Sequence, residues 1–289
     1  MGLRIAFMMV FSFALAAVPA LATGHGPVFG AATPTLGKGG WQLDQAWMAR
    51  IVEGPRSDEQ TLRTMIGYGI TEDLQISGSL PIRLQGSIYM PRGRMTAMMS
   101  SAKEIEGLVS WRFHRRVIGA GARVESTLTG GVAAPLEQFS PDGMKAAPSA
   151  HISAASGFVS RAHYFWLGGG YHWHAQRGLD RMGNVSFLSA VYGYRPPFLR
   201  QDYPKPDLRF FVEAIAEHTE RGTHHGFEVL SSGGRSMFVG PSALLLYKAY
   251  AIEAGILFPL HQDNRFAPAE RYRFALNASY FFWRHGSDR

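Results

Sequence analysis

Alternation of apolar and polar residues with a period of two runs through most of the chain after residue 39. In the first such segment, Trp41, Leu43 and Trp47 share one parity, and Gln42 and Asp44 share the other. Successive side chains of a β-strand point to opposite faces, so this pattern predicts a strand with one apolar and one polar face. A chain built of many such strands must close or cover its sheet edges.

Segments of this kind recur about twelve times, separated by short clusters of Gly, Pro, Asp and charged residues. They cover residues 41–51, 62–70, 74–82, 105–113, 122–132, 150–158, 163–173, 185–194, 208–217, 237–246, 250–258 and 272–282. Turns are expected at 71–73, 114–116 and 160–161, and the Pro-rich stretch 195–207 is expected to be a surface link. The even number is typical of single-chain bacterial barrels, so we predict an all-β transmembrane antiparallel β-barrel of about 12 strands.

The first 22 residues are typical of a cleaved export signal. Arg4 supplies a positive charge, residues 5–18 are uninterrupted apolar sequence, and Ala20-Leu21-Ala22 fits a small-x-small cleavage site. The apolar stretch is shorter than the roughly 20 residues that a membrane helix needs. We expect a signal peptide at 1–22, a periplasmic arm at 23–39, one barrel domain at 40–283 and a tail at 284–289, in the outer membrane of a Gram-negative cell.

Alternation alone also fits a soluble β-sandwich or a lipocalin-like barrel, because it shows only that one face of each strand is apolar. Acidic residues on the other face favour a hydrated lumen, since a dry core rejects carboxylates that are not paired. Aromatic residues near strand ends also favour a membrane barrel: Trp41, Tyr68, Trp111, Trp173, Tyr272 and Trp283. The expected partners are outer-membrane lipid and lipopolysaccharide, and the barrel-assembly machinery, which would recognise the aromatic closing strand.

Composition excludes several classes of function. The chain has no cysteine, so disulfides, thiol nucleophiles and thiolate metal sites are ruled out. Its net charge of +7 suits contact with anionic head groups. No basic helix or aromatic RNA-binding motif is present, and export points away from cytosolic nucleic acid, so we expect no nucleic-acid partner.

Charged residues on the predicted inward faces are the candidate pore-lining set. They are Arg63, Arg112, Arg123, Glu125, Glu213, Glu217 and Glu253. Such residues can form rings that set the selectivity of a channel. They can equally pair with one another and fill a narrow barrel, whose diameter grows with strand number. Both interpretations stay open, and we favour a narrow, partly filled pore.

A metal site is a second hypothesis. Four methionines lie in one connection that the hairpin count places outside the cell: Met90, Met95, Met98 and Met99. Thioethers select Cu(I), although methionines also simply fill irregular gaps. The adjacent pair His224 and His225 could add imidazole ligands, and His151, His172, His174 and His218 are further candidates for the same side. No H-E-x-x-H spacing occurs, so we expect no cofactor, with copper as the alternative.

An enzyme would need a nucleophile, a base and an orienting group that converge in space. His151 with Ser153 or Ser156 is the nearest approach to such a set, and no G-x-S-x-G motif occurs. Small Ser, Ala and Gly residues also fit a crowded barrel wall. We favour the wall, and therefore expect that the protein is not an enzyme.

Four stretches carry a family resemblance: HGPVFGAATPTLGKGGWQLD, YGITEDLQISGSLP, YGYRPPFLRQDYPKPDLRFFVEA and YAIEAGILFPL. They resemble the outer-membrane transporter family named for the MetA pathway of phenol degradation, over nearly the whole mature chain. The resemblance implies a barrel that transports a small solute, aromatic or hydrophobic if the family name is a guide. It implies no catalytic or binding residues. The alternatives are a metal-related barrel with a Met and His mouth site, and a structural or adhesive barrel.

Overall fold

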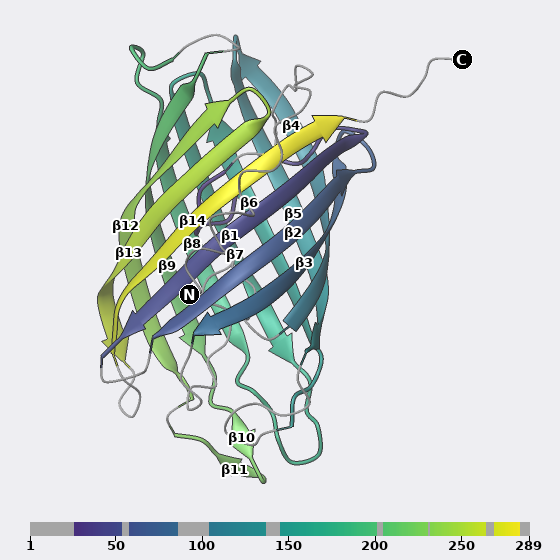
Figure 1. Cartoon of the computed structure of the whole chain (residues 1–289), viewed down its shortest axis with the longest axis vertical. Coiled ribbons are helices and arrows are strands. Elements are labelled where there is room, and N and C mark those ends of the chain that lie inside the picture. Colours follow the sequence, from purple (N-terminus) through teal and green to yellow (C-terminus); the bar gives the residue numbers. More distant parts are fainter. Residues whose placement is uncertain are drawn as a thin grey trace, which may run out of the picture.

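The computed structural model describes residues 26–53, 58–85, 104–136, 145–200, 205–230, 232–263 and 269–283. These residues form one closed barrel of twelve antiparallel strands and a separate two-stranded sheet (Figure 1). In the described parts, no helix combines the length and apolar character needed to cross a membrane. The predicted fold class, an antiparallel barrel of about twelve strands, is confirmed.

The strands follow one another around the barrel in chain order, and β1 pairs with β14 to close it. β9 pairs directly with β12, because β10 and β11 form the small separate sheet. The strands are β1 (Gly40–Val52), β2 (Glu59–Gly69), β3 (Leu74–Gln85), β4 (Glu104–Gly119), β5 (Ala122–Pro135), β6 (Ser149–Val159), β7 (His163–His174), β8 (Val185–Tyr194), β9 (Asp207–Thr219), β10 (Thr223–His224), β11 (Phe227–Glu228), β12 (Gly234–Tyr247), β13 (Tyr250–Asp263) and β14 (Glu270–Trp283).

The two ends of the barrel differ in their connections. At one end, where β1 begins and β14 ends, most neighbouring strands are joined by turns of a few residues, such as 70–73, 120–121 and 248–249. We call this the turn end. The opposite end carries the longer connections, including β10 and β11, and we call it the loop end (Figure 1).

One predicted turn is wrong. Residues 114–116 were expected to form the turn between the fourth and fifth strands, but they lie within β4, and Arg115 pairs with Glu125 in the ladder. The turn is Ala120-Gly121 instead, and Gly121 has φ of 74°. Glycine adopts that left-handed conformation without steric cost, whereas charged residues can continue a strand at the rim of a barrel.

Apolar and polar residues divide between the outer and inner faces as the alternation predicts. Large exposed apolar side chains cover the outside, among them Ile66, Ile76, Ile82, Val109, Leu167, Leu188, Val212 and Ile252. On β7, Tyr164 and Trp166 are buried inside, and Phe165 and Leu167 are exposed outside. A band of exposed apolar residues this extensive is typical of a surface that contacts lipid or another protein.

Several expected features lie outside the described residues. They are the signal peptide at 1–22, the methionine-rich connection and the tail at 284–289. Residues 23–39 were expected to form a periplasmic arm. The part that is described, from Gly26 onward, lies inside the barrel, where its backbone bonds inward-facing side chains of the wall.

Candidate functional site: a lumen filled by the N-terminal arm

Residues 26–39, here called the lumen arm, enter the barrel at the turn end and lie inside the barrel lumen (Figure 1). Where the arm joins β1, the Gly39 N–H donates to the Gly69 carbonyl of β2 at 2.8 Å. The fit is close: a Cβ atom on Gly69 would lie 2.0 Å from the Gly37 carbonyl oxygen. Glycine at position 69 therefore lets the arm cross the rim of the wall.

The innermost part of the arm is bound by a carboxylate of the wall. Glu213, halfway along β9 and 0% exposed, accepts hydrogen bonds from three consecutive backbone N–H groups. The N–H of Val28 lies 2.9 Å from Oε1, and those of Phe29 and Gly30 lie 2.8 and 2.7 Å from Oε2. The Ser242 hydroxyl also donates to Oε1. Hydrogen bonds to a charged acceptor are roughly twice as strong as neutral ones, so Glu213 is the main polar anchor of the arm.

Close contact between arm and wall continues beside this anchor. A Cβ atom added to Gly30 would lie 2.4 Å from a methyl carbon of Val191, so only glycine fits here without a shift. The next residue, Ala31, donates its N–H to the Ser189 hydroxyl at 3.1 Å. The arm thus uses backbone groups, which do not depend on side-chain length, to approach β8 and β9.

Phe29 is the apolar anchor. Its side chain is fully buried in a cluster of inward-facing residues from both sides of the closing seam. The cluster contains Ala46, Met48, Ile215, Phe238, Leu257 and Ala275. Burial of a Phe side chain stabilises a contact by about 1.5–3 kcal/mol relative to exposure. The inner wall of the barrel therefore provides an apolar site, here called the seat of Phe29, which the Phe29 side chain fills.

Farther toward the turn end, Thr33 is bound on three sides. The Trp166 indole N–H donates to its hydroxyl at 3.0 Å, and the Thr127 hydroxyl donates to its carbonyl at 2.6 Å. The Thr33 hydroxyl donates in turn to Glu125 at 3.4 Å. These contacts explain why a tryptophan and a carboxylate face inward at this level, since both serve the arm.

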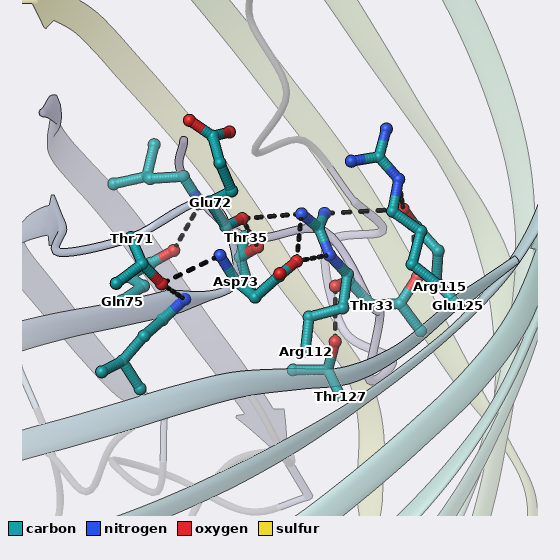
Figure 2. Close-up of polar contacts among 12 residues, drawn as sticks. Thr33, Thr35, Thr71, Glu72, Asp73, Gln75, Arg112, Arg115, Glu125 and Thr127 are labelled. Carbon is teal, nitrogen blue, oxygen red and sulfur yellow. Dashed lines mark hydrogen bonds and ion pairs between the residues drawn. The ribbon is translucent and has the colours of Figure 1, made fainter. Parts of the chain in front are cut away.

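Arg112 of β4 ties the turn between β2 and β3 to the wall (Figure 2). Its Nη2 donates to the Glu72 carbonyl at 2.6 Å, and its Nε donates to the Asp73 carboxylate at 2.9 Å. The same turn faces the arm, because the Thr35 hydroxyl donates to the Glu72 carbonyl at 3.5 Å, and next to the turn Gln75 of β3 accepts from the Leu36 N–H at 2.8 Å. Arg112 thereby stabilises the part of the rim over which the arm enters.

Three arginine side chains surround the Glu125 carboxylate, next to the contact between Arg112 and the turn at 70–73. Arg123 Nε lies 2.7 Å from its Oε1. Arg112 Nη1 lies 3.5 Å and Arg115 Nε lies 3.8 Å from the same oxygen (Figure 2). Glu125 itself is 0% exposed. Three of the seven predicted inward charges, Arg112, Arg123 and Glu125, therefore form one ion-paired cluster.

A second ion-pair network lies in the loop half of the lumen, around Arg273 of β14. Its two Nη atoms donate to Glu217 of β9 at 2.9 and 2.8 Å, and its Nε donates to Glu270 at 2.8 Å. Arg50 then links Glu270 to Glu59, with both separations 3.4 Å. Since β12 and β13 lie between β9 and β14, the Arg273 and Glu217 pair spans two strands along the inner wall.

The remaining predicted charges also lie inside. Glu253 of β13 accepts a hydrogen bond from the Asn277 amide at 3.1 Å, and Arg63 sits on the inward face of β2, opposite the buried Ala46. Four of the seven candidates take part in the ion pairs described above: Arg112, Arg123 and Glu125 with one another, and Glu217 with Arg273. Their role in selectivity stays a prediction.

Sequence reasoning missed Arg273, Glu270 and Asp44 as inward charges of the candidate set. The signal was present: the alternation that places Tyr272 and Phe274 outside also places Arg273 inside. It missed the contribution of the arm for a different reason. Backbone N–H groups carry most of the polar contacts of the arm, and residue types do not reveal them.

Of the predicted metal ligands, the structure describes all the histidines, whereas Met90, Met95, Met98 and Met99 lie outside the described residues. His224 Nδ1 lies 3.3 Å from a carboxylate oxygen of Asp180 in the connection between β7 and β8. Asp180 also accepts from the backbone N–H groups of His225 at 2.8 Å and Lys145 at 3.0 Å. These backbone hydrogen bonds lower the pKa of Asp180 below its ordinary value. Asp180 thus joins three connections of the loop end.

The two candidate catalytic serines lie on opposite faces of β6. His151 faces inward, whereas Ser156 lies on the outer face of β6 and bonds the Ser126 hydroxyl at 2.8 Å. His151 and Ser153 share the inward face of β6, with ladder partners His172 and Gly170 on β7.

No family model and no curated protein sequence matches the chain. Its fold is similar to that of the COG4313 outer membrane channel from Pseudomonas putida F1, with a TM-score of 0.62 and 11% identity over 86% of this chain and 97% of that one. The KdgM porin overlaps with a TM-score of 0.44 at 9% identity, over 83% of this chain and 99% of that one. Pseudomonas aeruginosa OprD overlaps with 0.42 at 9%, over 86% and 95%. The first likeness shows a shared barrel fold.

Proposed function

We propose that this protein is an outer-membrane channel for a small solute and that the lumen arm closes it. The exposed apolar outer face would contact lipid, with the turn end in the periplasm and the loop end outside the cell. The similar fold of a bacterial outer membrane channel supports this location. In this proposal the protein lets a solute cross the membrane and has no catalytic role.

The observation that carries the proposal is the binding of the arm by Glu213. Val28, Phe29 and Gly30 belong to no strand, yet their N–H groups converge on one buried carboxylate in the middle of the lumen. Withdrawing the arm breaks none of the ladder hydrogen bonds that hold the barrel closed. The arm can therefore leave while the wall stays intact, which is the property a gate requires.

The seat of Phe29 suggests the kind of solute. When the arm withdraws, an apolar site lined by Ile215, Phe238 and Leu257 opens beside the polar Glu213 and Ser242. An aromatic molecule with one polar group fits such a surface, because its ring replaces the Phe29 ring and its polar group reaches the carboxylate or hydroxyl. This agrees with the small aromatic or hydrophobic solute implied by the resemblance to the MetA-pathway family, whose membership is part of the proposal.

Single-channel recording of the refolded mature protein in planar bilayers tests the proposal. Glu213→Gln replaces one acceptor oxygen by an amide NH₂ that faces the arm N–H groups, so we expect longer or more frequent openings. Deletion of residues 26–36 should give a steady, larger conductance. Glu253→Gln is the matched control, since Glu253 faces the lumen and accepts a hydrogen bond from Asn277, which belongs to the wall.

Three results would contradict the proposal. Recovery of the protein from the soluble periplasm would exclude an outer-membrane channel. A deletion variant that folds but conducts no better than the unmodified protein would leave a structural or adhesive barrel. Equal effects of Glu213→Gln and Glu253→Gln would show that the arm is not the gate.

A further inference from the structure

A cluster of metal-ligating side chains lies in the lumen toward the loop end, apart from the arm. It contains Glu104, the first residue of β4, and His172 and His174, at the end of β7. One possible ligand atom from each residue lies within 4.8 Å of those of the other two. The residues are 5, 2 and 3% exposed, so all three are buried.

The sheet brings these residues together in a simple way. His172 and His174 are two apart on one strand, so both face the lumen, and their rings stack with centroids 4.4 Å apart. Glu104 reaches them from β4 across β5 and β6. Ala133, on the inward face of β5, has a side chain too short to block it, and on β6 the Ser149 hydroxyl donates to Glu104 Oε1 at 2.9 Å.

We propose that Glu104, His172 and His174 bind one divalent transition-metal ion of the zinc class. Two imidazole nitrogens and one carboxylate oxygen make a donor set that suits Zn²⁺ and Cu²⁺, whereas Ca²⁺ and Mg²⁺ prefer oxygen ligands alone. Ligand atoms about 2.0–2.2 Å from a shared tetrahedral ion lie about 3.3–3.5 Å from one another. The three ligand atoms here lie within 4.8 Å of one another, so side-chain rotations that shift each atom by about 1 Å would complete the site. A fourth position remains for water or solute.

Neighbouring groups hold the three side chains in place, as outer contacts do in metal sites. Ser149 pairs with His174 in the ladder while its hydroxyl orients the Glu104 carboxylate. The backbone N–H of His174 donates to the side-chain amide oxygen of Asn184 at 2.9 Å, and this hydrogen bond fixes the end of β7. The ring of His151 lies 6.0 Å from that of His172, centroid to centroid, and adds a further imidazole at the edge of the cluster.

The sequence named His172 and His174 as candidate ligands, but grouped them with the methionine-rich connection and with His224 and His225, and did not include Glu104. His224 lies beside Asp180 in the loop-end connections and belongs to no group of three close ligands among the described residues. An ion held by Glu104 and the two histidines would link β4 to β7 across two strands. It would do so whether or not the lumen arm is in place, so the inference does not depend on the proposed channel function.

Isothermal titration of Zn²⁺ and Cu²⁺ into the refolded, untagged mature protein tests the site. We expect one ion per chain, with Cu²⁺ bound more tightly than Zn²⁺. Glu104→Gln and His174→Gln each remove a ligand, so affinity should fall by about 100-fold or more, since loss of an outer contact alone costs about 10–100-fold. Ser149→Ala, which removes such a contact, should fall within that smaller range. The Cu²⁺ electron paramagnetic resonance spectrum should show coupling to two imidazole nitrogens.

His224→Gln is the matched control, because it removes an imidazole at the same end of the barrel but outside the cluster. It should bind as the unmodified protein does, and a heat-modifiable band in gel electrophoresis should show that every variant is folded. Absence of binding to the unmodified protein, or equal affinity in the folded Glu104→Gln and His174→Gln variants, overturns the proposal. Loss of binding in His224→Gln alone would move the site to the outer connections and also overturns it.

Discussion

The two halves of the lumen use the same residue type in different ways. Glu213 and Glu217 lie four residues apart on the inward face of β9. Glu213 accepts hydrogen bonds from the backbone of the lumen arm, whereas Glu217 receives both Nη groups of Arg273 from β14. One carboxylate therefore binds a segment that belongs to no strand, and the other binds a strand of the wall. The comparison teaches that an inward carboxylate in a barrel can bind a segment inside the lumen or link two strands of the wall, depending on its partner.

The strongest test of this difference is Arg273→Met. Arg273 is 2% exposed, and its loss removes the cation that binds Glu217 and one of the two cations, Arg273 and Arg50, that bind Glu270. Breaking a buried ion pair by removing one partner costs about 3–5 kcal/mol, so we expect the free energy of unfolding to fall by that amount. Denaturant titration of tryptophan fluorescence in detergent measures it. If Glu213→Gln lowers the stability as much, the two carboxylates have the same role and the comparison fails.

A charge placed on the outer face of β9, beside Glu213, tests whether the barrel tolerates charges on its inner face alone. Ala214, the neighbour of Glu213, points outward. Arginine there should cost about 2–4 kcal/mol if the residue lies near the membrane midplane, because the charge would face lipid. The same unfolding titration, performed in liposomes, measures the effect. A fully stable Ala214→Arg variant would contradict the assignment of the outer face.

A smaller effect on stability, with a large effect on the arm, is expected from Gly30→Val. Its side chain would collide with Val191 and displace the arm while leaving every wall ion pair in place. Because the chain has no cysteine, Thr33→Cys provides a unique label, and Thr33 is buried in the docked arm. A thiol reagent should modify Cys slowly in the single variant and quickly in the Gly30→Val double variant. Equal rates would mean that the arm does not depend on this close fit.

The smallest effect concerns the loop end and its pH dependence. The N–H groups of His225 and Lys145 lower the pKa of Asp180, so the ionised form is favoured by folding. This stabilisation is complete above the ordinary Asp pKa of about 4 and is lost as the pH falls through the lower folded value. Pepsin should therefore cut the connections at 175–184 and 220–230 faster at about pH 2 than at about pH 4.

Asp180→Asn should reduce that pH dependence, since asparagine does not titrate in this range. A variant whose cleavage rises as steeply as that of the unmodified protein would show that other carboxylates control the loop end.

The strand faces could be predicted because alternation is a local property of the chain: the pattern from Trp41 to Ile51 is sufficient to separate Leu43 from Asp44. The ion pairs could not, because Glu217 and Arg273 are 56 residues apart and meet only through the register of β9, β12, β13 and β14. The arm has no periodicity at all. The spacing of His172 and His174 was a usable signal, since two histidines on one face of a strand are natural co-ligands.

The position of the arm also connects the lumen to maturation of the chain. Cleavage after Ala22, as the sequence predicts, creates a new N-terminus three residues before Gly26, or about 10 Å of extended chain. On that prediction, the segment that Glu213 binds is the first part of the mature chain. If the arm also closes the barrel, as proposed, the protease that removes the signal sets the length of the segment that closes it.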